Sequence, residues 1–157
     1  MTTAATSFSP SATPFDAKLL DRLMDEAGID VLLATSKHNV QYLLGGHRAF
    51  FFDYMDAMGL SRYLPVLVYA KGAPDKAAYF GHRLENFQRE NNPFWTPEVQ
   101  TQSSGSLDAM KKAIEYLRRL GLERRRIGAE LAFLPMDAGT ALRDAVADGG
   151  LTDAFLR

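Results

Sequence analysis

The sequence predicts an α/β fold in which a β-sheet is covered by helices. Short apolar runs of strand length alternate with longer segments whose apolar residues recur at helical spacing, which is typical of this fold class. The chain has 157 residues, enough for one domain to bury a single core without a stabilising metal or disulfide. We therefore expect one α/β domain.

The composition limits the classes of partner. Charged residues make up 24% of the chain and leave a formal net charge of -1, which argues against a general nucleic-acid or membrane-surface binder. The chain has no cysteine and no apolar run long enough to span a membrane, so we expect a cytoplasmic protein. Residues 1–13 are rich in Ser, Thr, Ala and Pro and predict a flexible tail, with the domain occupying residues 14–157.

The first expected helix begins after Asp16 and ends at Gly28. The Asp16 side chain can cap it, and Phe15 can pack against Leu20 as a hydrophobic staple. Five residues are expected to share its apolar face: Leu19, Leu20, Leu23, Met24 and Ala27. Residues 29–35, IDVLLAT, then predict a short strand that is buried on both faces of the sheet.

A short helix capped by Ser36 is expected next. Its apolar and aromatic residues are Val40, Tyr42, Leu43 and Leu44. Gly45 supplies a left-handed exit that a side chain would resist. Because Gly45 and Gly46 follow a helix and not a strand, they do not match a dinucleotide-binding fingerprint.

Residues 64–70 and 77–81 are expected to pair as a hairpin around KGAPDK, residues 71–76, where Gly and Pro make the reversal. Residues 82–91 predict a polar helix that stops before a proline. EVQTQ, residues 98–102, alternates like a strand that is half exposed to water.

The second half of the chain has the clearer periodicity. Ser106 is expected to cap a helix that Gly121 ends, with five apolar positions at helical spacing: Leu107, Met110, Ile114, Leu117 and Leu120. Residues 126–131, RIGAEL, predict the next strand. Pro135 suits the first turn of a helix that carries Ala138, Leu142 and Val146, and residues 151–155, LTDAF, predict a last short strand.

Few side chains suggest catalysis. Three histidines lack the spacing of a metal-binding pair, and we interpret them as surface or hydrogen-bonded structural groups: His38, His47 and His82. Asp53 and Asp56 could face one way on a helical turn, but loop carboxylates of this kind are usually solvated. The basic run at residues 118–126 covers an expected helix C-terminus, where cations are favourable, and we interpret it as a solvated face.

A run of three phenylalanines at residues 50–52 is more informative. Leaving phenyl groups in water forgoes about 1.5 to 3 kcal/mol each, so some burial is expected. In one interpretation residues 49–54 form a buried edge strand, with Phe50 and Phe52 on the core face and Phe51 turned outward. In the other, the run anchors an interface, because aromatic and arginine side chains dominate binding hot spots, and Arg48 and Arg62 lie nearby in the sequence.

SKHNVQYLLGG, residues 36–46, resembles the HN-x-x-Y-x-x-G segment of the N-terminal domain in the creatinase, prolidase and Xaa-Pro aminopeptidase family. GIDVLLAT precedes this segment, and RIGAE and LP follow it, in the family's order. The resemblance covers nearly the whole chain from about Phe15. It implies an α/β domain of ribonuclease H-like topology, with a mixed sheet of about six strands flanked by helices, which agrees with the elements expected above.

The resemblance also implies that the catalytic groups lie elsewhere. In the family's peptidases, two Asp, one His and two Glu bind two divalent metal ions, such as manganese, in a following "pita-bread" domain; creatinase itself works without metal. We therefore expect this chain to be the non-catalytic N-terminal domain of a longer Xaa-Pro peptidase or related C-N hydrolase. Alone, it is expected to be inactive, with no catalytic residue, metal ligand or cofactor of its own.

The expected partners are the missing catalytic domain and a second subunit, in a homodimer or higher oligomer. In the family this domain helps to build the dimer and overhangs the neighbouring active site; in creatinase an aromatic residue and an arginine from it touch the neighbour's substrate. The candidates for such a substrate wall or interface are Arg48, Phe50, Phe51, Phe52 and Arg62. The alternative is a self-contained module that binds a ligand or protein through the same loop and has no catalytic half.

Three residues of the motif have an expected structural role. Asn39 is a short amide in a first helical turn and can tie down a neighbouring loop. Tyr42 can bury its ring while its hydroxyl reaches a partner, and Gly45 allows the helix exit. We expect these roles to be structural and not catalytic.

Overall fold

The computed structural model describes residues 13–47, 65–91, 94–146 and 149–154. Along the chain it contains the following elements: α1 (Ala17–Ala27), β1 (Val31–Ala34), α2 (Lys37–Leu43), β2 (Val66–Ala70), β3 (Ala73–His82), η2 (Arg83–Glu85), α4 (Asn86–Asn91), β4 (Glu98–Ser103), α5 (Ser106–Arg119), β5 (Ile127–Ala129), η3 (Leu131–Phe133), α6 (Met136–Ala145) and β6 (Leu151–Asp153). Strands and helices alternate for most of this length, as expected.

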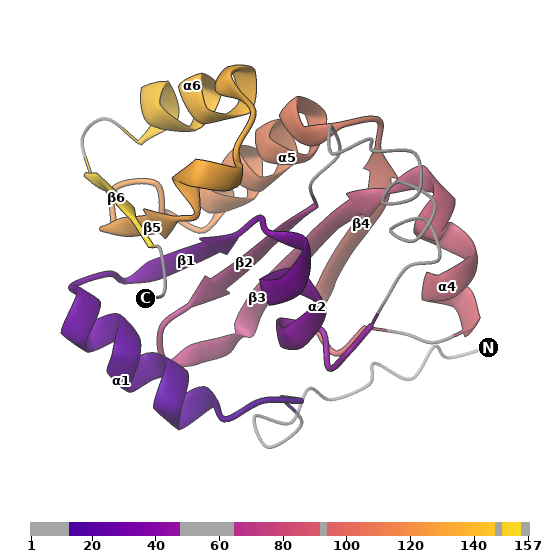
Figure 1. The fold of residues 1–157 in the computed structure, drawn as a ribbon, viewed down its shortest axis with the longest axis horizontal. Helices are drawn as coiled ribbons and strands as arrows, with labels where there is room; N and C mark the ends of the chain where they lie inside the picture. The colour runs from indigo at the N-terminus through magenta and orange to yellow at the C-terminus, as the bar shows by residue number, and fades with distance from the viewer. Residues whose placement is uncertain (1–12, 48–64, 92–93, 147–148, 155–157) are drawn as a thin grey trace.

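The described strands form one six-stranded sheet in the order β4-β3-β2-β1-β5-β6 (Figure 1). β2 pairs antiparallel with both β1 and β3, whereas the β1–β5, β3–β4 and β5–β6 pairs are parallel. β2 therefore runs against the other five strands. The predicted mixed six-stranded sheet with flanking helices is confirmed.

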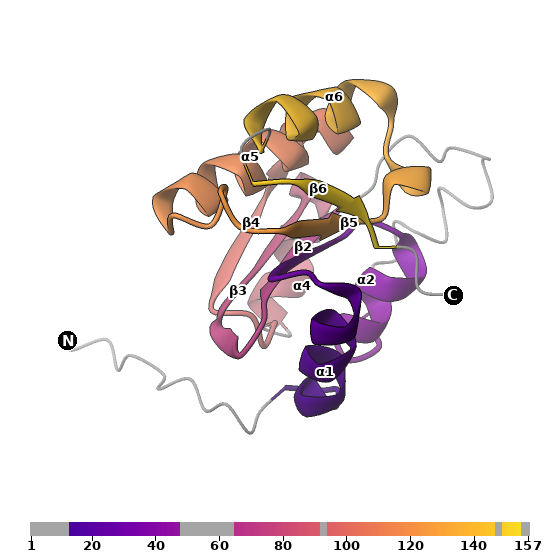
Figure 2. The ribbon, with the colours of Figure 1, turned by 90° about the vertical axis from the view of Figure 1, so that its left-hand side faces the viewer.

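Helices cover both faces of the sheet. α5 and α6 lie on one face, which we call the α5/α6 face, and α1 and α2 lie on the other, the α1/α2 face (Figure 2). Successive strand residues point to opposite faces, so Val31 and Leu33 pack towards α5 while Leu32 and Ala34 pack towards α1 and α2. All four residues of β1 are buried, which explains why its sequence is continuously apolar.

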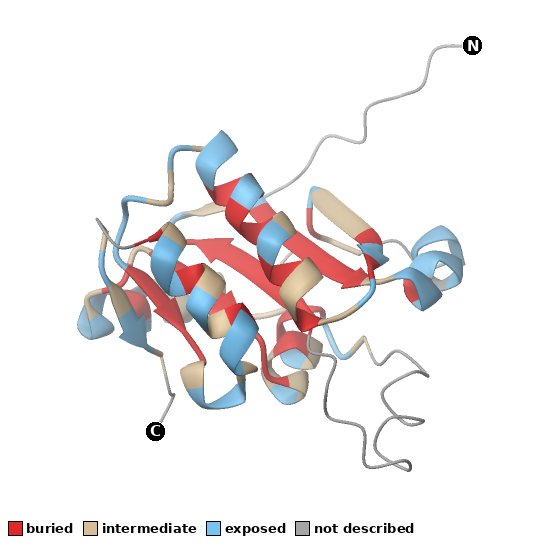
Figure 3. Cartoon of the chain, turned by 90° about the horizontal axis from the view of Figure 1, so that it is seen from above, coloured by how far each residue is buried: buried red, intermediate tan, exposed pale blue. Residues whose placement is uncertain are grey.

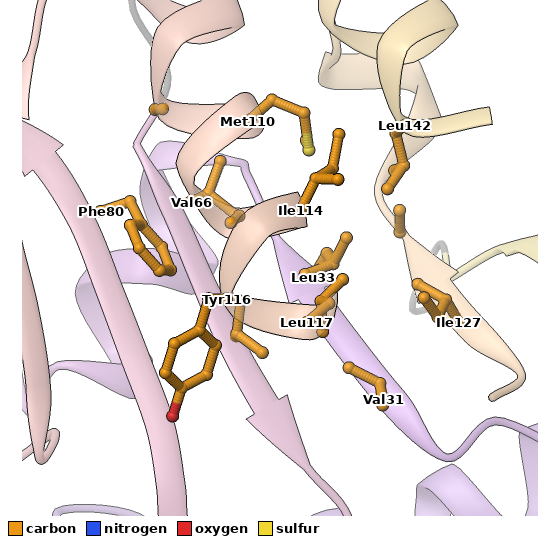
Figure 4. Packing of buried hydrophobic residues seen from close by; sticks show 14 of the residues in the cluster. Val31, Leu33, Val66, Phe80, Met110, Ile114, Tyr116, Leu117, Ile127 and Leu142 are labelled. Atoms are coloured by element: carbon orange, nitrogen blue, oxygen red, sulfur yellow. The ribbon is translucent and has the colours of Figure 1, made fainter. Parts of the chain in front are cut away.

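The larger core cluster lies on the α5/α6 face (Figure 4). Met110, Ile114 and Leu117 of α5 are buried there, as the helical spacing predicts, and two further predicted positions, Leu107 and Leu120, are partly buried. Seen from this side, the strands are mostly buried beneath helices whose outward surfaces are exposed (Figure 3). One helix face and one sheet face are therefore sealed against each other.

The predicted ends of α1 and α2 are confirmed. The Asp16 side chain accepts a hydrogen bond from the Leu19 backbone N–H at 3.0 Å, and Gly28 ends α1 with a φ of 69°. Ser36 accepts from the Asn39 backbone N–H at 3.3 Å, and Gly45, with a φ of 74°, follows α2.

Three local predictions are wrong. Ser106 is the first residue of α5 and not its cap; Gly105 occupies the cap position, and the Asp108 carboxylate accepts from the Ser104 backbone N–H at 3.0 Å. Proline is not part of the hairpin reversal, because Pro74 already lies in β3, near the strand start where its missing N–H is tolerated. Pro135 immediately precedes α6 and is not in its first turn.

Candidate functional site

The motif segments that follow β1 and β5 meet at the carboxyl edge of the sheet. These two strands are adjacent and parallel, so the segments that follow them leave the sheet at the same edge. Ser36 and Asn39 lie just after β1, and Glu130 lies just after β5. In open α/β sheets this edge is where ligand sites usually form, so its polar groups are the first candidates for function.

Glu130 is buried, and its carboxylate accepts four hydrogen bonds. The donors are the backbone N–H groups of Thr35 and Ser36, each at 2.7 Å, the Ser36 hydroxyl at 2.7 Å and the Asn39 side-chain amide at 2.5 Å. Ser36 caps α2, Thr35 directly precedes the cap, and Asn39 lies in the first turn, so the carboxylate lies at the N-terminal end of α2, where the helix dipole favours a negative charge. Because Glu130 directly follows β5, its carboxylate connects the end of β1 and the start of α2 to β5.

The structural predictions for this motif have two different outcomes. Asn39 does tie down a neighbouring segment, through Glu130, as expected. The prediction for Tyr42 is wrong, because its side chain is 62% exposed and contacts Phe15 at a ring separation of 6.4 Å. Val40 and Leu43 form the buried side of α2, and Tyr42 lies on its other side. Gly45 follows the end of α2 in the left-handed conformation, as predicted.

A second buried carboxylate, Glu85, lies at the end of β3. It accepts hydrogen bonds from the Tyr79 hydroxyl at 2.7 Å and from the His82 backbone N–H at 2.5 Å, and His47 Nε2 lies 3.9 Å from its Oε1. Burial raises the pKa of Glu85, while the bonds from Tyr79 and His82 act in the opposite direction. Gly81 lies against this group, and a Cβ there would collide with the carboxylate.

Glu85 was not among the residues predicted from the sequence. A usable signal was present, because Glu85 stands three residues after His82, and the two residues form a reciprocal capping box at η2. The three histidines have separate surroundings: His38 is exposed, His82 Nδ1 accepts from the Leu84 backbone N–H, and His47 packs on Phe94 beside Glu85. Within the described ranges, His, Asp and Glu side chains form no group of three or more that could hold a metal ion.

The basic run makes two ion pairs with described residues: Arg119 Nη2 lies 3.2 Å from the Glu98 carboxylate, and Arg126 pairs with Asp30. Arg126 binds both carboxylate oxygens of Asp30 through Nε at 3.0 Å and Nη2 at 2.9 Å, and this contact holds the pKa of Asp30 well below its usual range. Arg118 and Arg119 lie in the last turn of α5, where the dipole favours them. The run therefore lies where it was predicted, but Arg126 also connects two parts of the fold.

An apolar groove runs along α1 on the α1/α2 face. It consists of two adjoining hollows that share Leu20, Leu23, Leu32 and Ala154, and the first has a volume of about 110 Å³. We call this feature the α1 groove; its other apolar lining residues are Phe15, Leu19, Met24, Ala27, Ile29, Ala34, Tyr42 and Leu43. Leu19 and Leu23 are 40% and 38% exposed. The predicted apolar face of α1 exists, but the fold covers only part of it.

The five candidates for a substrate wall lie outside the described residues: Arg48, Phe50, Phe51, Phe52 and Arg62. The same is true of Asp53 and Asp56 and of the edge strand expected at 49–54. Their roles stay predictions. Among the residues that the structure describes, none of the helices has the length and apolar character needed to cross a membrane.

Several solved structures share this fold. The Xaa-Pro dipeptidase from Bacillus anthracis superposes with a TM-score of 0.60 at 19% sequence identity, covering 88% of this chain and 32% of the dipeptidase. The N-terminal domain of cytoplasmic peptidase PepQ from Mycobacterium tuberculosis H37Rv gives a TM-score of 0.58 at 19% identity, covering 88% of this chain and 91% of that domain.

The Creatinase/Prolidase N-terminal domain of an X-Pro dipeptidase from Streptococcus pyogenes gives a TM-score of 0.59 at 14% identity and covers 88% and 92% of the two chains. This chain thus spans about a third of the B. anthracis enzyme and nearly all of each isolated N-terminal domain. A comparison with curated protein sequences gave no match. The family model described as Creatinase/Prolidase N-terminal domain matches residues 17–154. The chain belongs to the creatinase/prolidase N-terminal domain family.

Proposed function

We propose that this chain is the non-catalytic N-terminal domain of an Xaa-Pro peptidase or a related C-N hydrolase. The observation that carries the proposal is the family match over residues 17–154, together with the length relation to relatives. The chain corresponds to nearly all of the separately solved N-terminal domains but to about a third of a whole Xaa-Pro dipeptidase. In such an enzyme the other two thirds would carry the hydrolytic groups.

The described residues do not fit a site for two divalent metal ions. Glu130 and Glu85 are the two buried carboxylates, and each already accepts several hydrogen bonds from the chain itself. A metal would have to displace those donors and leave them unpaired in a buried place, which is costly. We therefore assign metal binding to the catalytic domain of the parent enzyme.

We further propose that the segment containing Arg48, the three phenylalanines and Arg62 forms one wall of a neighbouring subunit's substrate cleft and supports dimer assembly. Its two flanks support this assignment. His47 contacts Glu85 at the end of β3, and Val66 at the start of β2 pairs with Phe80 near the same end. Both described flanks of the segment therefore lie at the carboxyl edge of the sheet, where ligand sites commonly form.

The non-catalytic role is tested by assaying the purified chain with alanyl-proline and added manganese. We expect no hydrolysis by the chain alone, and hydrolysis by the enzyme that also contains the catalytic domain. Turnover by the chain alone that a chelator abolishes would contradict the proposal.

The location proposed for the parent enzyme is the cytoplasm, in analogy with the M. tuberculosis relative, which is described as a cytoplasmic peptidase.

The α1 groove favours a second candidate, a self-contained module that binds a protein or an apolar ligand. The two functions differ in the partner that binds and in the effect on catalysis. Binding to a metallopeptidase domain of the same enzyme supports the first. Binding to another protein, with no effect on any Xaa-Pro peptidase, supports the second.

A further inference from the structure

We propose that the α1 groove is the surface on which this domain docks the catalytic domain of its own enzyme. The inference rests on the proposed function and adds to it the location of the contact and the kind of side chain that fits. The occupant is a set of apolar side chains on the surface of the catalytic domain.

The groove exposes apolar side chains that are gathered in one place. Leu19 and Leu23 lie one helical turn apart on α1, and Tyr42 of α2 lines the same hollow. Phe15, just before α1, packs its ring against Tyr42 of α2 and against Trp95, which precedes β4. A contiguous patch of this kind is typical of an interaction surface, whereas single exposed apolar residues are ordinary.

The exposure does not come from a poorly formed helix. α1 is capped at both ends, by Asp16 and Gly28, and is anchored by the buried Met24. α5 buries seven of its residues, whereas α1 buries Met24 alone. The sequence of α1 thus provides more apolar surface than the sheet beneath it covers, and the exposed remainder is available to a partner.

The position of Ala154 indicates which partner this is. Ala154 lines both hollows of the groove, follows β6 directly and is the last residue of the family match. In a whole relative about two thirds of the chain lies outside the matched region. A domain that follows this position begins at the groove itself, and elements that are consecutive in sequence usually lie next to each other.

The lining also indicates the chemistry of the occupant. Asn39 and Glu130 reach one end of the groove, but they are hydrogen-bonded to each other. Asp16 at the rim caps α1. Asp153 lines the second hollow, and its carboxylate accepts a hydrogen bond from the Leu131 backbone N–H. The rest of the lining is aliphatic or aromatic, and a hollow of about 110 Å³ accommodates an apolar group such as a leucine or phenyl side chain.

The test uses the double variant Leu19→Asp/Leu23→Asp with Met136→Asp as a matched control. Met136 is also an exposed apolar helical residue, but it begins α6, away from the groove. The catalytic domain of the same enzyme is titrated with each form of the chain. Trp95 is the only tryptophan and its ring lies 5.5 Å from Phe15, so its fluorescence reports binding at the groove.

We expect the double variant to bind at least about tenfold more weakly than wild type, because a charge replaces each apolar contact, and Met136→Asp to bind normally. If the double variant does not fold, Tyr42→Ser at the same groove serves instead and is expected to weaken binding severalfold. Binding unchanged by groove variants overturns the inference, and so does a wild-type chain that uses these residues to pair with a second copy.

The outcome for the proposed function is read separately. If the groove variants bind normally and the catalytic domain still requires this chain for full activity, only the docking site is wrong. If the wild-type chain neither binds the catalytic domain nor changes its activity towards alanyl-proline, the proposed function is wrong, and the docking inference fails with it.

Discussion

The two faces of the sheet are formed by the same strands but differ in how completely helices cover them. On the α5/α6 face, Met110, Ile114 and Leu117 are buried against strand residues in one apolar cluster. The α1/α2 face has a smaller cluster, both buried carboxylates beside it, and a groove where Leu19 and Leu23 stay exposed. The first face is complete within the described chain. On the second face the hydrogen-bonded carboxylates of Glu130 and Glu85 connect neighbouring segments, and apolar side chains of α1 remain exposed.

The strongest test of this difference compares one leucine from each face. Leu117→Ala is expected to lower the free energy of unfolding by about 2–5 kcal/mol, because it leaves a cavity in the sealed core. Leu23→Ala removes a partly exposed side chain and is expected to cost less than about 1 kcal/mol. Urea denaturation of the isolated chain measures both. Equal losses would mean that α1 is packed as tightly as α5.

The next test removes the polar anchor of the α1/α2 face. Glu130→Ala leaves four donors at the start of α2 without their acceptor, and we expect a loss of about 3 kcal/mol in unfolding free energy. The control is Glu115→Ala, which removes an exposed carboxylate from α5 and is expected to change stability little. If the two variants are equally stable, the carboxylate of Glu130 does not hold α2.

A smaller effect is expected at the exit of α2. Gly45 and Gly46 both have positive φ, but a Cβ on Gly45 would lie 2.8 Å from Cβ of Pro14, whereas one on Gly46 would meet open space. Alanine at either position strains the backbone, and at Gly45 it also displaces the segment that leads into α1. Gly45→Ala is expected to be about 1 kcal/mol less stable than Gly46→Ala, measured by thermal and urea unfolding. Identical unfolding free energies for the two variants would show that Pro14 can move away from a Cβ at position 45 at no cost.

The smallest effect concerns pH and Glu85. Burial raises the pKa of Glu85, so between the ordinary value of 4.5 and the higher folded value the native state binds more protons than the unfolded state. Protonation of Glu85 therefore stabilises the native state at low pH. This stabilisation is lost as the pH rises through the folded pKa. Relative to Glu85→Gln, wild type should lose stability over this window. Parallel stability curves for the two proteins would contradict the assignment.

Local patterns in the sequence predicted most of the fold. The ends of α1 and α2 follow from Asp16, Gly28 and Ser36, whose capping acts within a few residues. The strand β1 follows from an apolar run that only burial on both faces explains. The hairpin was predicted, but its reversal was placed too broadly, because the left-handed Gly72 after Lys71 is sufficient to turn the chain.

The candidate site could be predicted only in part, because its contacts are distant in sequence. Asn39 was expected to hold a neighbouring segment, but its partner Glu130 lies 91 residues away. Helical spacing predicted that Leu19, Leu23 and Met24 share a face, yet it does not indicate how much of that face the sheet covers. Tyr42 was misplaced for the same reason, since its exposure depends on which side of α2 meets the core.

The central claim is that the α1/α2 face is an assembly surface, whereas the α5/α6 face is a finished core. Amide hydrogen exchange measured on the chain alone and on the enzyme that contains the catalytic domain tests this without any substitution. We predict slower exchange in α1 and α2 when the catalytic domain is present, with α5 and α6 unchanged. Protection that appears at α5 and α6, or unchanged exchange in α1 and α2, would contradict the claim.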